Sequence, residues 1–370
     1  MRMSIALRVC AHRTGMPTKS RPGLTLGELM AGWGRILTGR APMLSIEVTR
    51  ECPLRCPGCY AYGDNHLGGE RTLRELSDFR GDALVNGILE LVAKHRPLHV
   101  SLVGGEPLVR HRELSRVLPE LSHRGIFTLV VTSGVIPIPK GWIGLPRGRV
   151  AVSVDGLPEV HDPRRKPATY SRILENIRDR EVNIHWTITR PMVQRKQDLQ
   201  DYVAFWSERP EVNRIWVSLY TPQQGESSPE VLLPEDRALL SRELMLLHER
   251  YPKFLMSPGI ARALVAPPKN PEECLFSKMS TNYSADLTSR IEPCIFGGKP
   301  DCAQCGCAIS IGLHHAQGFR LAGPLKVKHL VKGSVAVGSL LNRFRNSASK
   351  PTRWTRHKAP AEDQDLVQIR

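Results

Sequence analysis

Three closely spaced cysteines form the part of this chain that is best suited to chemistry. Cys52, Cys56 and Cys59 stand in a C-x3-C-x2-C run directly after an apolar, strand-like segment at residues 43–49. One short loop can therefore bring three thiolates to a single inorganic centre and leave a fourth ligand position open. A structural zinc site takes four protein ligands, whereas a [4Fe–4S] cluster held by three cysteines keeps one iron free for a substrate or cofactor. The spacing therefore predicts a reactive cluster site.

A second motif follows at the end of an extended, β-branched run at residues 99–103. It reads Gly104-Gly105-Glu106-Pro107. Two glycines let the backbone approach a ligand closely, and the Glu106 carboxylate can accept a hydrogen bond from an ammonium group. The ordered pair of motifs, C-x3-C-x2-C and then a strand ending in GGEP, resembles the radical S-adenosylmethionine (radical SAM) superfamily.

The resemblance implies that the three cysteines hold a [4Fe–4S] cluster whose open iron binds the amino and carboxylate groups of S-adenosylmethionine (SAM). It also implies that residues 104–107 bind the cofactor through its amino group. In such enzymes the reduced cluster cleaves SAM, and a 5′-deoxyadenosyl radical then removes hydrogen from an unactivated C–H bond. Many members carry an aromatic residue that contacts adenine just before the third cysteine. Here that position is Gly58, and Tyr60 follows the cysteine instead.

Two later strand ends resemble elements of radical SAM enzymes that modify peptides and cofactors. Ser133 closes one predicted strand, and Ser153 begins a Ser-Val-Asp-Gly run that is similar to their SxDG element. By that resemblance both serines bind the cofactor, and Arg172 reaches its carboxylate. Ser-Gly and Asp-Gly pairs are also ordinary turn residues, so a purely structural role is the alternative. We expect His161, in the next loop, to make hydrogen bonds rather than to act as a catalytic base.

Five of the nine cysteines lie together later in the chain, among Gly, Pro and Asp residues typical of metal-binding loops. They are Cys274, Cys294, Cys302, Cys305 and Cys307. Their place after the predicted barrel resembles the SPASM or twitch cluster modules of radical SAM enzymes, although the spacing does not match the full SPASM pattern. We expect four of the five to hold a second [4Fe–4S] cluster, with zinc as the alternative and inert thiols as a third reading. Cys10 is isolated and is expected to be unreactive.

Extended apolar segments alternate with helical ones after residue 43. Strands are predicted near 44–49, 98–103, 127–132, 149–154, 182–188 and 213–219, and helices within 73–94, 114–121, 170–178, 197–205 and 235–249. Six such units predict a parallel α/β sheet, and the resemblance implies a partial (β/α)6 TIM-like barrel. The motifs then fall at the carboxyl ends of strands, where barrel enzymes place their chemistry. The loop after the sixth strand adds candidates for the substrate cavity, Tyr220, Gln223, Gln224 and Glu226.

The two ends of the chain hold most of its net charge of +16. Residues 1–41 contain seven Lys/Arg and one acidic residue, and residues 313–370 contain eleven Lys/Arg and three acidic residues. We therefore expect four parts: a basic extension with an amphipathic helix at 1–41, the radical SAM barrel at 42–250, a cysteine-rich module at 251–312, and a basic tail at 313–370. The helix is expected to pack its apolar stripe on the barrel, and the tail to be disordered from residue 346 onward.

A cytoplasmic location is the expectation from composition. No apolar stretch approaches the roughly 18 residues of a membrane span, and residues 1–11 lack the features of a signal peptide. Nine cysteines in a reducing compartment favour metal or cluster ligation over disulfides. The basic ends favour an anionic partner, and the candidates are an inner membrane surface at which the protein would be peripheral, a nucleic acid or an acidic peptide. The sequence contains no aromatic stacking platform or reader motif, which argues against nucleic acid.

The sequence thus predicts a radical SAM oxidoreductase that receives electrons from a flavodoxin- or ferredoxin-type donor. The cysteine-rich module favours the modification of a peptide or another natural product, whereas the basic ends favour a membrane lipid as substrate. A methyltransferase fits less well, because nothing that resembles a cobalamin-binding domain precedes the barrel. The alternative from another class is a non-catalytic iron–sulfur electron carrier or binding protein. The GGEP segment argues against that alternative, because a carrier needs no cradle for an amino acid.

Overall fold

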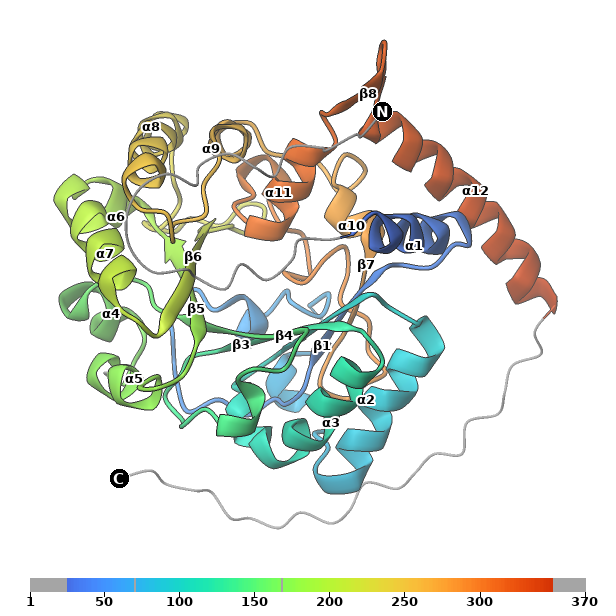
Figure 1. Cartoon of the computed structure of the whole chain (residues 1–370), viewed down its shortest axis with the longest axis horizontal. Coiled ribbons are helices and arrows are strands. Elements are labelled where there is room, and N and C mark those ends of the chain that lie inside the picture. Colours follow the sequence, from blue (N-terminus) through green and yellow to red (C-terminus); the bar gives the residue numbers. More distant parts are fainter. Residues whose placement is uncertain (1–24, 70, 168, 349–370) are drawn as a thin grey trace.

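A seven-stranded parallel sheet forms the centre of the molecule (Figure 1). The computed structural model describes residues 25–69, 71–167 and 169–348. The spatial order of the strands is β6-β5-β4-β3-β2-β1-β7. The strands are β1 (Met43–Glu47), β2 (His99–Val103), β3 (Phe127–Thr132), β4 (Gly148–Ser153), β5 (Val182–Ile188), β6 (Val212–Leu219) and β7 (Ser280–Tyr283). The predicted α/β fold, with a parallel sheet of β/α units, is confirmed.

At least one helix follows each of the first six strands, and further helices come after the last of these. Those of the barrel are α2 (Gly81–His95), α3 (His111–His123), α4 (Pro158–Arg164), α5 (Tyr170–Asn176), α6 (Arg190–Val193), α7 (Lys196–Glu208) and α8 (Pro234–Arg250). After them come α9 (Pro258–Val265), α10 (Leu275–Met279), α11 (Ala308–Ala316) and α12 (Val327–Ala348), with a small hairpin of β8 (Arg320–Ala322) and β9 (Leu325–Lys326) before α12. Helix α2 begins later than predicted, and residues 73–75 form a separate helical turn.

The seventh strand is a feature that the sequence analysis did not predict. Strand β7 pairs in parallel with β1, with Met43 opposite Ser280 and Ile46 opposite Tyr283. Its Ser-Thr-Asn-Tyr sequence is short and polar, so it lacks the apolar pattern that identifies buried strands. The strand lies within residues 251–312, which means that the segment expected to be a separate module also contributes to the main sheet.

The two faces of the sheet differ in character. Trp186 of β5 stacks on Tyr202 of α7 with ring centroids 4.1 Å apart, so this face packs against the helices. The strand register places polar residues on the opposite face, for example His185 beside Ser153, and Ser45 beside Ser101. Parallel strands that are buried on both faces are usually apolar on both. The interior of this barrel is therefore suited to a polar ligand.

The second group of cysteines lies on a segment that fastens to the edge strand β6. The Leu219 amide donates to the Gly306 carbonyl oxygen at 2.9 Å, and the Gly306 amide donates to the Thr221 hydroxyl at 2.9 Å. A side chain at position 306 would overlap the Leu219 backbone, so only glycine allows this approach. Pairing of this kind covers the free edge of β6.

Helix α1 (Leu26–Leu37) begins with a capping box formed by Thr25 and Glu28. Its apolar stripe is only partly covered: Ile36 is buried, whereas Leu26 is 75% exposed. The expectation that the whole stripe packs on the barrel is therefore wrong for its first turns. The expectations for residues 1–24 and 349–370, including the disordered end of the tail, lie outside the described residues. Within the described part of the chain, no helix is long and apolar enough to cross a membrane.

Candidate cluster and cofactor site

The three cysteines of the first motif lie in the loop after β1, at the carboxyl end of that strand. All three are partly buried, and the Cys52 sulfur accepts a hydrogen bond from the Leu54 amide at 3.4 Å. Burial raises the pKa of the Cys52 thiol to about 12, and the charges of Cys56 and Cys59 contribute to that rise. Burial also raises the pKa of the other two thiols. The three thiols thus lie in one partly buried loop and feel one another's charge, so a bound cation or cluster would be needed to keep them as thiolates.

The two glycines of GGEP are required by the neighbouring backbone. Gly104 has a φ of +104°, and a side chain at Gly105 would overlap the Glu51 carbonyl oxygen. The Glu106 amide donates to that same oxygen at 2.7 Å. The end of β2 is therefore fastened to the residue just before Cys52. The two glycines thus allow the GGEP segment to contact the first cysteine loop, in addition to letting the backbone approach a ligand closely.

Glu106 organises the ends of two neighbouring strands. Its buried carboxylate accepts hydrogen bonds from the Leu108 amide at 2.9 Å, the Ser133 amide at 2.7 Å, and the hydroxyls of Thr132 and Ser133. Pro107 is buried in the turn that follows. Glu106 and Ser133, both predicted to contact the cofactor, thus bind each other in this structure. Their roles toward SAM stay predictions, and their structural role is to join β2 to β3.

A buried ion-pair cluster lies beside the first cysteine loop. The Asp155 carboxylate pairs with the Arg165 Nε at 2.7 Å and with Arg164 at 3.1 Å. Burial acts to raise the pKa of Asp155, but the two arginines outweigh it and hold that pKa well below its ordinary value. Arg165 also opposes the rise in the pKa of Cys56, so its positive charge lies close to that thiol. This charge is suited to an anionic ligand at the loop.

The neighbours of this cluster revise two expectations from the sequence. Ser153 is buried at the end of β4, as predicted, but Arg172 is exposed on α5. The cation near the cysteines is instead Arg165, which the sequence analysis missed although two adjacent arginines follow the His-Asp element. Burial lowers the pKa of His161 to about 4, and its Nδ1 accepts a hydrogen bond from the Asp155 amide at 3.2 Å. His161 therefore supports the loop as a neutral side chain.

The candidates after β6 separate into two groups. Tyr220 donates to the Glu226 carboxylate at 2.5 Å, and a side chain at Gly58 would lie 2.8 Å from the Tyr220 hydroxyl. Tyr220 therefore covers the first cysteine loop. Gln223 accepts a hydrogen bond from the Lys299 amide at 2.8 Å and so belongs to the joint with the second cysteine segment. Gln224 is exposed.

All five cysteines of the second group line one pocket, together with side chains that include Phe276, Phe296 and Ser310. Cys274, Cys305 and Cys307 are buried, and burial raises the pKa of Cys307 to about 12. The structure thus brings the second predicted group together as well. Within the described residues, no three Cys, His, Asp or Glu side chains are arranged to hold a single metal ion.

Arg237 of α8 lies against the second group. It is buried, and it donates hydrogen bonds to the carbonyl oxygens of Leu264 at 2.9 Å, Cys305 at 3.2 Å, and Gln304. Among the described residues, no carboxylate forms an ion pair with it, and its Nε has no hydrogen-bond partner. An uncompensated buried cation is costly. Arg237 does not itself line the pocket, but its charge lies close to the Cys305 thiol and favours negative charge there.

His66 connects the two cysteine segments. Its Nε2 lies 2.8 Å from the buried Glu47 carboxylate of β1, and its Nδ1 lies 2.9 Å from the Phe296 carbonyl oxygen. Both partners only accept hydrogen bonds, so an imidazolium with two N–H groups satisfies both. Burial lowers the pKa of His66, but Glu47 outweighs this effect and raises it. The Glu47 carboxylate also accepts a hydrogen bond from Ser284, directly after β7.

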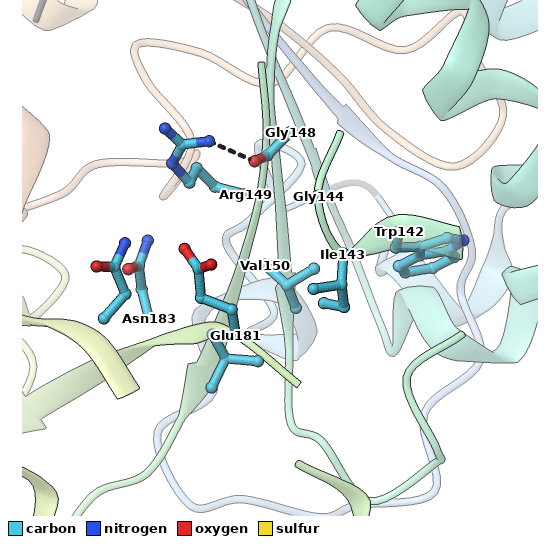
Figure 2. Close-up of a pocket in the computed structure, with 10 residues that line it drawn as sticks. Trp142, Ile143, Gly144, Gly148, Arg149, Val150, Glu181 and Asn183 are labelled. Carbon is cyan, nitrogen blue, oxygen red and sulfur yellow. Dashed lines mark hydrogen bonds between the residues drawn. The ribbon is translucent and has the colours of Figure 1, made fainter. Parts of the chain in front are cut away.

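A further pocket lies at the opposite, amino-terminal ends of β4, β5 and β6 (Figure 2). Trp142, Arg149, Glu181 and Asn183 are among its lining residues, and Arg149 donates to the Gly148 carbonyl oxygen at 2.7 Å. In parallel barrels this end serves stability, whereas chemistry occurs at the carboxyl ends of strands. The candidate site is therefore the one formed by the cysteine loops.

Comparison with known proteins agrees with this assignment. Residues 46–205 match the radical SAM superfamily. No curated protein sequence matches the chain significantly. Among solved structures, anSMEcpe with bound AdoMet is similar at a TM-score of 0.50 and 16% identity, over 83% of this chain and 99% of that one.

Streptococcus suis SuiB bound to S-adenosylmethionine is similar at a TM-score of 0.50 and 17% identity, over 66% of this chain and 59% of SuiB. The form of SuiB bound to its precursor peptide SuiA gives a TM-score of 0.50 and 16% identity, over 85% of this chain and 75% of SuiB. At these identities the likeness shows the fold, and the sequence match adds the family. Residues 46–205 of this chain therefore form a domain of the radical SAM superfamily.

Proposed function

We propose that this enzyme modifies a peptide or a related natural product, and that Cys52, Cys56 and Cys59 hold its SAM-binding [4Fe–4S] cluster. The observation that carries the proposal is the arrangement of two cysteine sites at one rim of a barrel with a polar interior. When bound, the cluster and SAM supply a 5′-deoxyadenosyl radical that removes hydrogen from an unactivated C–H bond.

The residues around the first loop have distinct tasks in this proposal. The backbone at Gly104 and Gly105 and the side chain of Ser153 border the cofactor. Arg165 supplies positive charge for the SAM carboxylate. Tyr220 covers the loop and limits the access of water. The protein thereby positions and shields the reacting groups, since the cofactors carry the difficult chemistry.

We further propose that four of the five later cysteines hold a second [4Fe–4S] cluster rather than zinc. Ligands of one zinc ion must converge on a single point, whereas each cysteine of a cluster binds a different iron. All five cysteines line one pocket, so four of them could serve as the ligands of one cluster. The buried cation Arg237 supports an anionic occupant. A second cluster would pass electrons to or from the substrate, with a flavodoxin- or ferredoxin-type protein as the external donor.

The peptide substrate is favoured by the second cysteine site and by the likeness to SuiB, whose structure was determined with a precursor peptide. A membrane lipid is the second candidate substrate, because the basic ends of the chain would bring the enzyme to a lipid surface. A non-catalytic electron carrier is the remaining alternative. Both candidate enzymes would cleave SAM, whereas the electron carrier would not.

Anaerobic reconstitution tests the proposal, with iron and sulfide counted per chain and 5′-deoxyadenosine measured after reduction by dithionite. The wild type is compared with the Cys52/Cys56/Cys59→Ala and Cys274/Cys305/Cys307→Ala variants. We expect the first variant to retain iron and lose SAM cleavage, and the second to lose part of its iron. Single Cys→Ala variants then identify the cysteine that is not a ligand. A fully loaded wild type that never cleaves SAM, with or without candidate peptides, would favour the carrier.

A further inference from the structure

Exposed apolar side chains concentrate on the first helix and the last elements of the described chain. Among the residues that the structure describes, twelve large apolar side chains are strongly exposed, and nine of them belong to α1, the β8–β9 hairpin with the residue before it, and α12. The nine are Leu26, Leu29, Met30, Phe319, Leu321, Leu325, Val337, Leu340 and Leu341. Single exposed apolar residues are ordinary, but a group on neighbouring elements marks an interaction surface.

The hairpin and α12 form a continuous structure that stands outside the barrel (Figure 1). The Val327 amide, at the start of α12, donates to the Phe319 carbonyl oxygen at 2.9 Å. Helix α12 rests on α1 through Gly338 and through a hydrogen bond of 2.6 Å from the Trp33 indole to Ser334. This contact leaves Leu340 on α12 54% exposed. A two-stranded hairpin is marginally stable by itself, so a partner at this surface would stabilise it.

The charge of these elements indicates the kind of partner. Residues 302–341 contain four Lys/Arg and no Asp or Glu. Arg320, Lys328 and Lys332 are exposed on the same elements as the apolar side chains. The one acidic residue of α1, Glu28, is already ion-paired with Arg147 at 2.5 Å. The surface therefore complements an anionic partner that also accepts apolar side chains.

We propose that residues 319–341, the terminal face, bind the surface of a membrane that contains anionic lipids. Phe319, Leu321 and Leu340 would enter the boundary between headgroups and acyl chains, while the lysines attract lipid phosphates. This inference does not depend on the chemistry proposed above.

Two other occupants fit less well. A symmetric contact with a second copy would place the basic side chains of the terminal face against themselves. A bound peptide strand would need a longer free edge than the hairpin offers, since β8 has three residues and β9 has two. A lipid surface needs only a protruding apolar and basic face.

Cosedimentation of the full chain with vesicles tests the proposal. We expect binding to vesicles of phosphatidylcholine with phosphatidylglycerol, weaker binding as salt increases, and little binding to phosphatidylcholine alone. Two variants alter the face, Phe319→Ser/Leu321→Ser and Lys328→Glu/Lys332→Glu. Each is expected to weaken binding about tenfold or more, because the first removes two apolar side chains that would enter the lipid and the second reverses two positive charges near its surface. Two exposed controls elsewhere, Leu246→Ser and Lys94→Glu/Lys269→Glu, should bind as the wild type does.

The folded state of each variant is checked by circular dichroism before binding is compared. Absence of wild-type binding to anionic vesicles would overturn the proposal, as would an equal loss in the face variants and the controls. Light scattering tests whether a second copy of this chain covers the face instead. A wild-type dimer that does not bind vesicles, and that the Phe319→Ser/Leu321→Ser variant converts to a monomer, would show that the partner is a second copy and not a membrane.

Discussion

Tyr60 packs edge-on against Phe296, with ring centroids 5.2 Å apart and ring planes at 80°. Tyr60 directly follows Cys59 of the first cysteine loop, and Phe296 lies two residues after Cys294 of the second. At the adjacent Gly297, a side chain would overlap the His66 backbone, so the two loops are in close contact. The two cysteine loops are therefore in direct contact, so a substitution in one loop alters the surroundings of the other.

The first prediction concerns this contact. Tyr60→Leu removes the ring contacts with Phe296 and His66 and is expected to lower the free energy of unfolding by about 1–3 kcal/mol. Tyr60→Phe keeps the ring, so its stability should stay within about 0.5 kcal/mol of the wild type. Urea unfolding of the iron-free protein measures both. Equal stability of the two variants would show that the ring contact contributes nothing.

The second prediction concerns the buried cation at the second site. Arg237→Met leaves three backbone carbonyl oxygens without their donor and is expected to cost about 1–3 kcal/mol of stability. Loss of the positive charge should also shift the reduction midpoint of the second cluster to a more negative potential, measured by electron paramagnetic resonance during a redox titration. Arg242→Met, at an exposed position on the same helix, is the control. An unchanged midpoint in Arg237→Met would argue against an anionic cluster beside Arg237.

The third prediction concerns the joint between β2 and β3. In Glu106→Gln an amide replaces a carboxylate that accepts four hydrogen bonds, so the new NH2 group faces the backbone amide of either Leu108 or Ser133, depending on which oxygen it replaces. We expect a loss of about 2–3 kcal/mol in unfolding free energy, because hydrogen bonds to charged groups are the strong ones. Equilibrium dialysis should also show weaker SAM binding to the reconstituted variant. The exposed pair of Glu120 and Arg124 provides the control: Glu120→Gln should change stability by less than about 1 kcal/mol.

The fourth prediction concerns acid stability. Burial lowers the pKa of His99, His161 and His185 to about 4, against an ordinary value of 6.5. Between these pH values the unfolded chain binds protons that the folded protein does not, so stability decreases as the pH falls from 6.5 toward 4. Each unit of pKa shift corresponds to about 1.4 kcal/mol.

His66 acts in the opposite direction, because its raised pKa adds stability that is present below pH 6.5 and is lost as the pH rises through its folded-state value. The lowered pKa values of the three buried histidines outweigh the raised pKa of His66. The urea concentration at the unfolding midpoint should therefore be lower at pH 5 than at pH 7.5. His185→Gln should reduce this difference. A midpoint that rises on acidification would contradict the assignment of these histidines as buried and neutral.

Local patterns in the sequence were sufficient for most of the fold and for both cysteine groups. Six strands have apolar, β-branched runs, and the cysteine spacings identify their own loops. Features that depend on distant partners could not be predicted in this way. Glu47 meets His66 and Ser284, and Arg237 meets Cys305, only after folding. Strand β7 was missed for a related reason, because its short polar sequence forms a strand only through its pairing with the distant β1.

The pairing of β1 with β7 also bears on the order of events during synthesis. Ser284 and Glu47 are separated by 237 positions in the sequence and bond to each other at the base of the first cysteine loop. Until the ribosome has released residues 280–284, the outer edge of β1 has no partner strand and the loop lacks part of its support. The support of the first cysteine loop is therefore complete only after the chain that lines both cysteine sites has emerged.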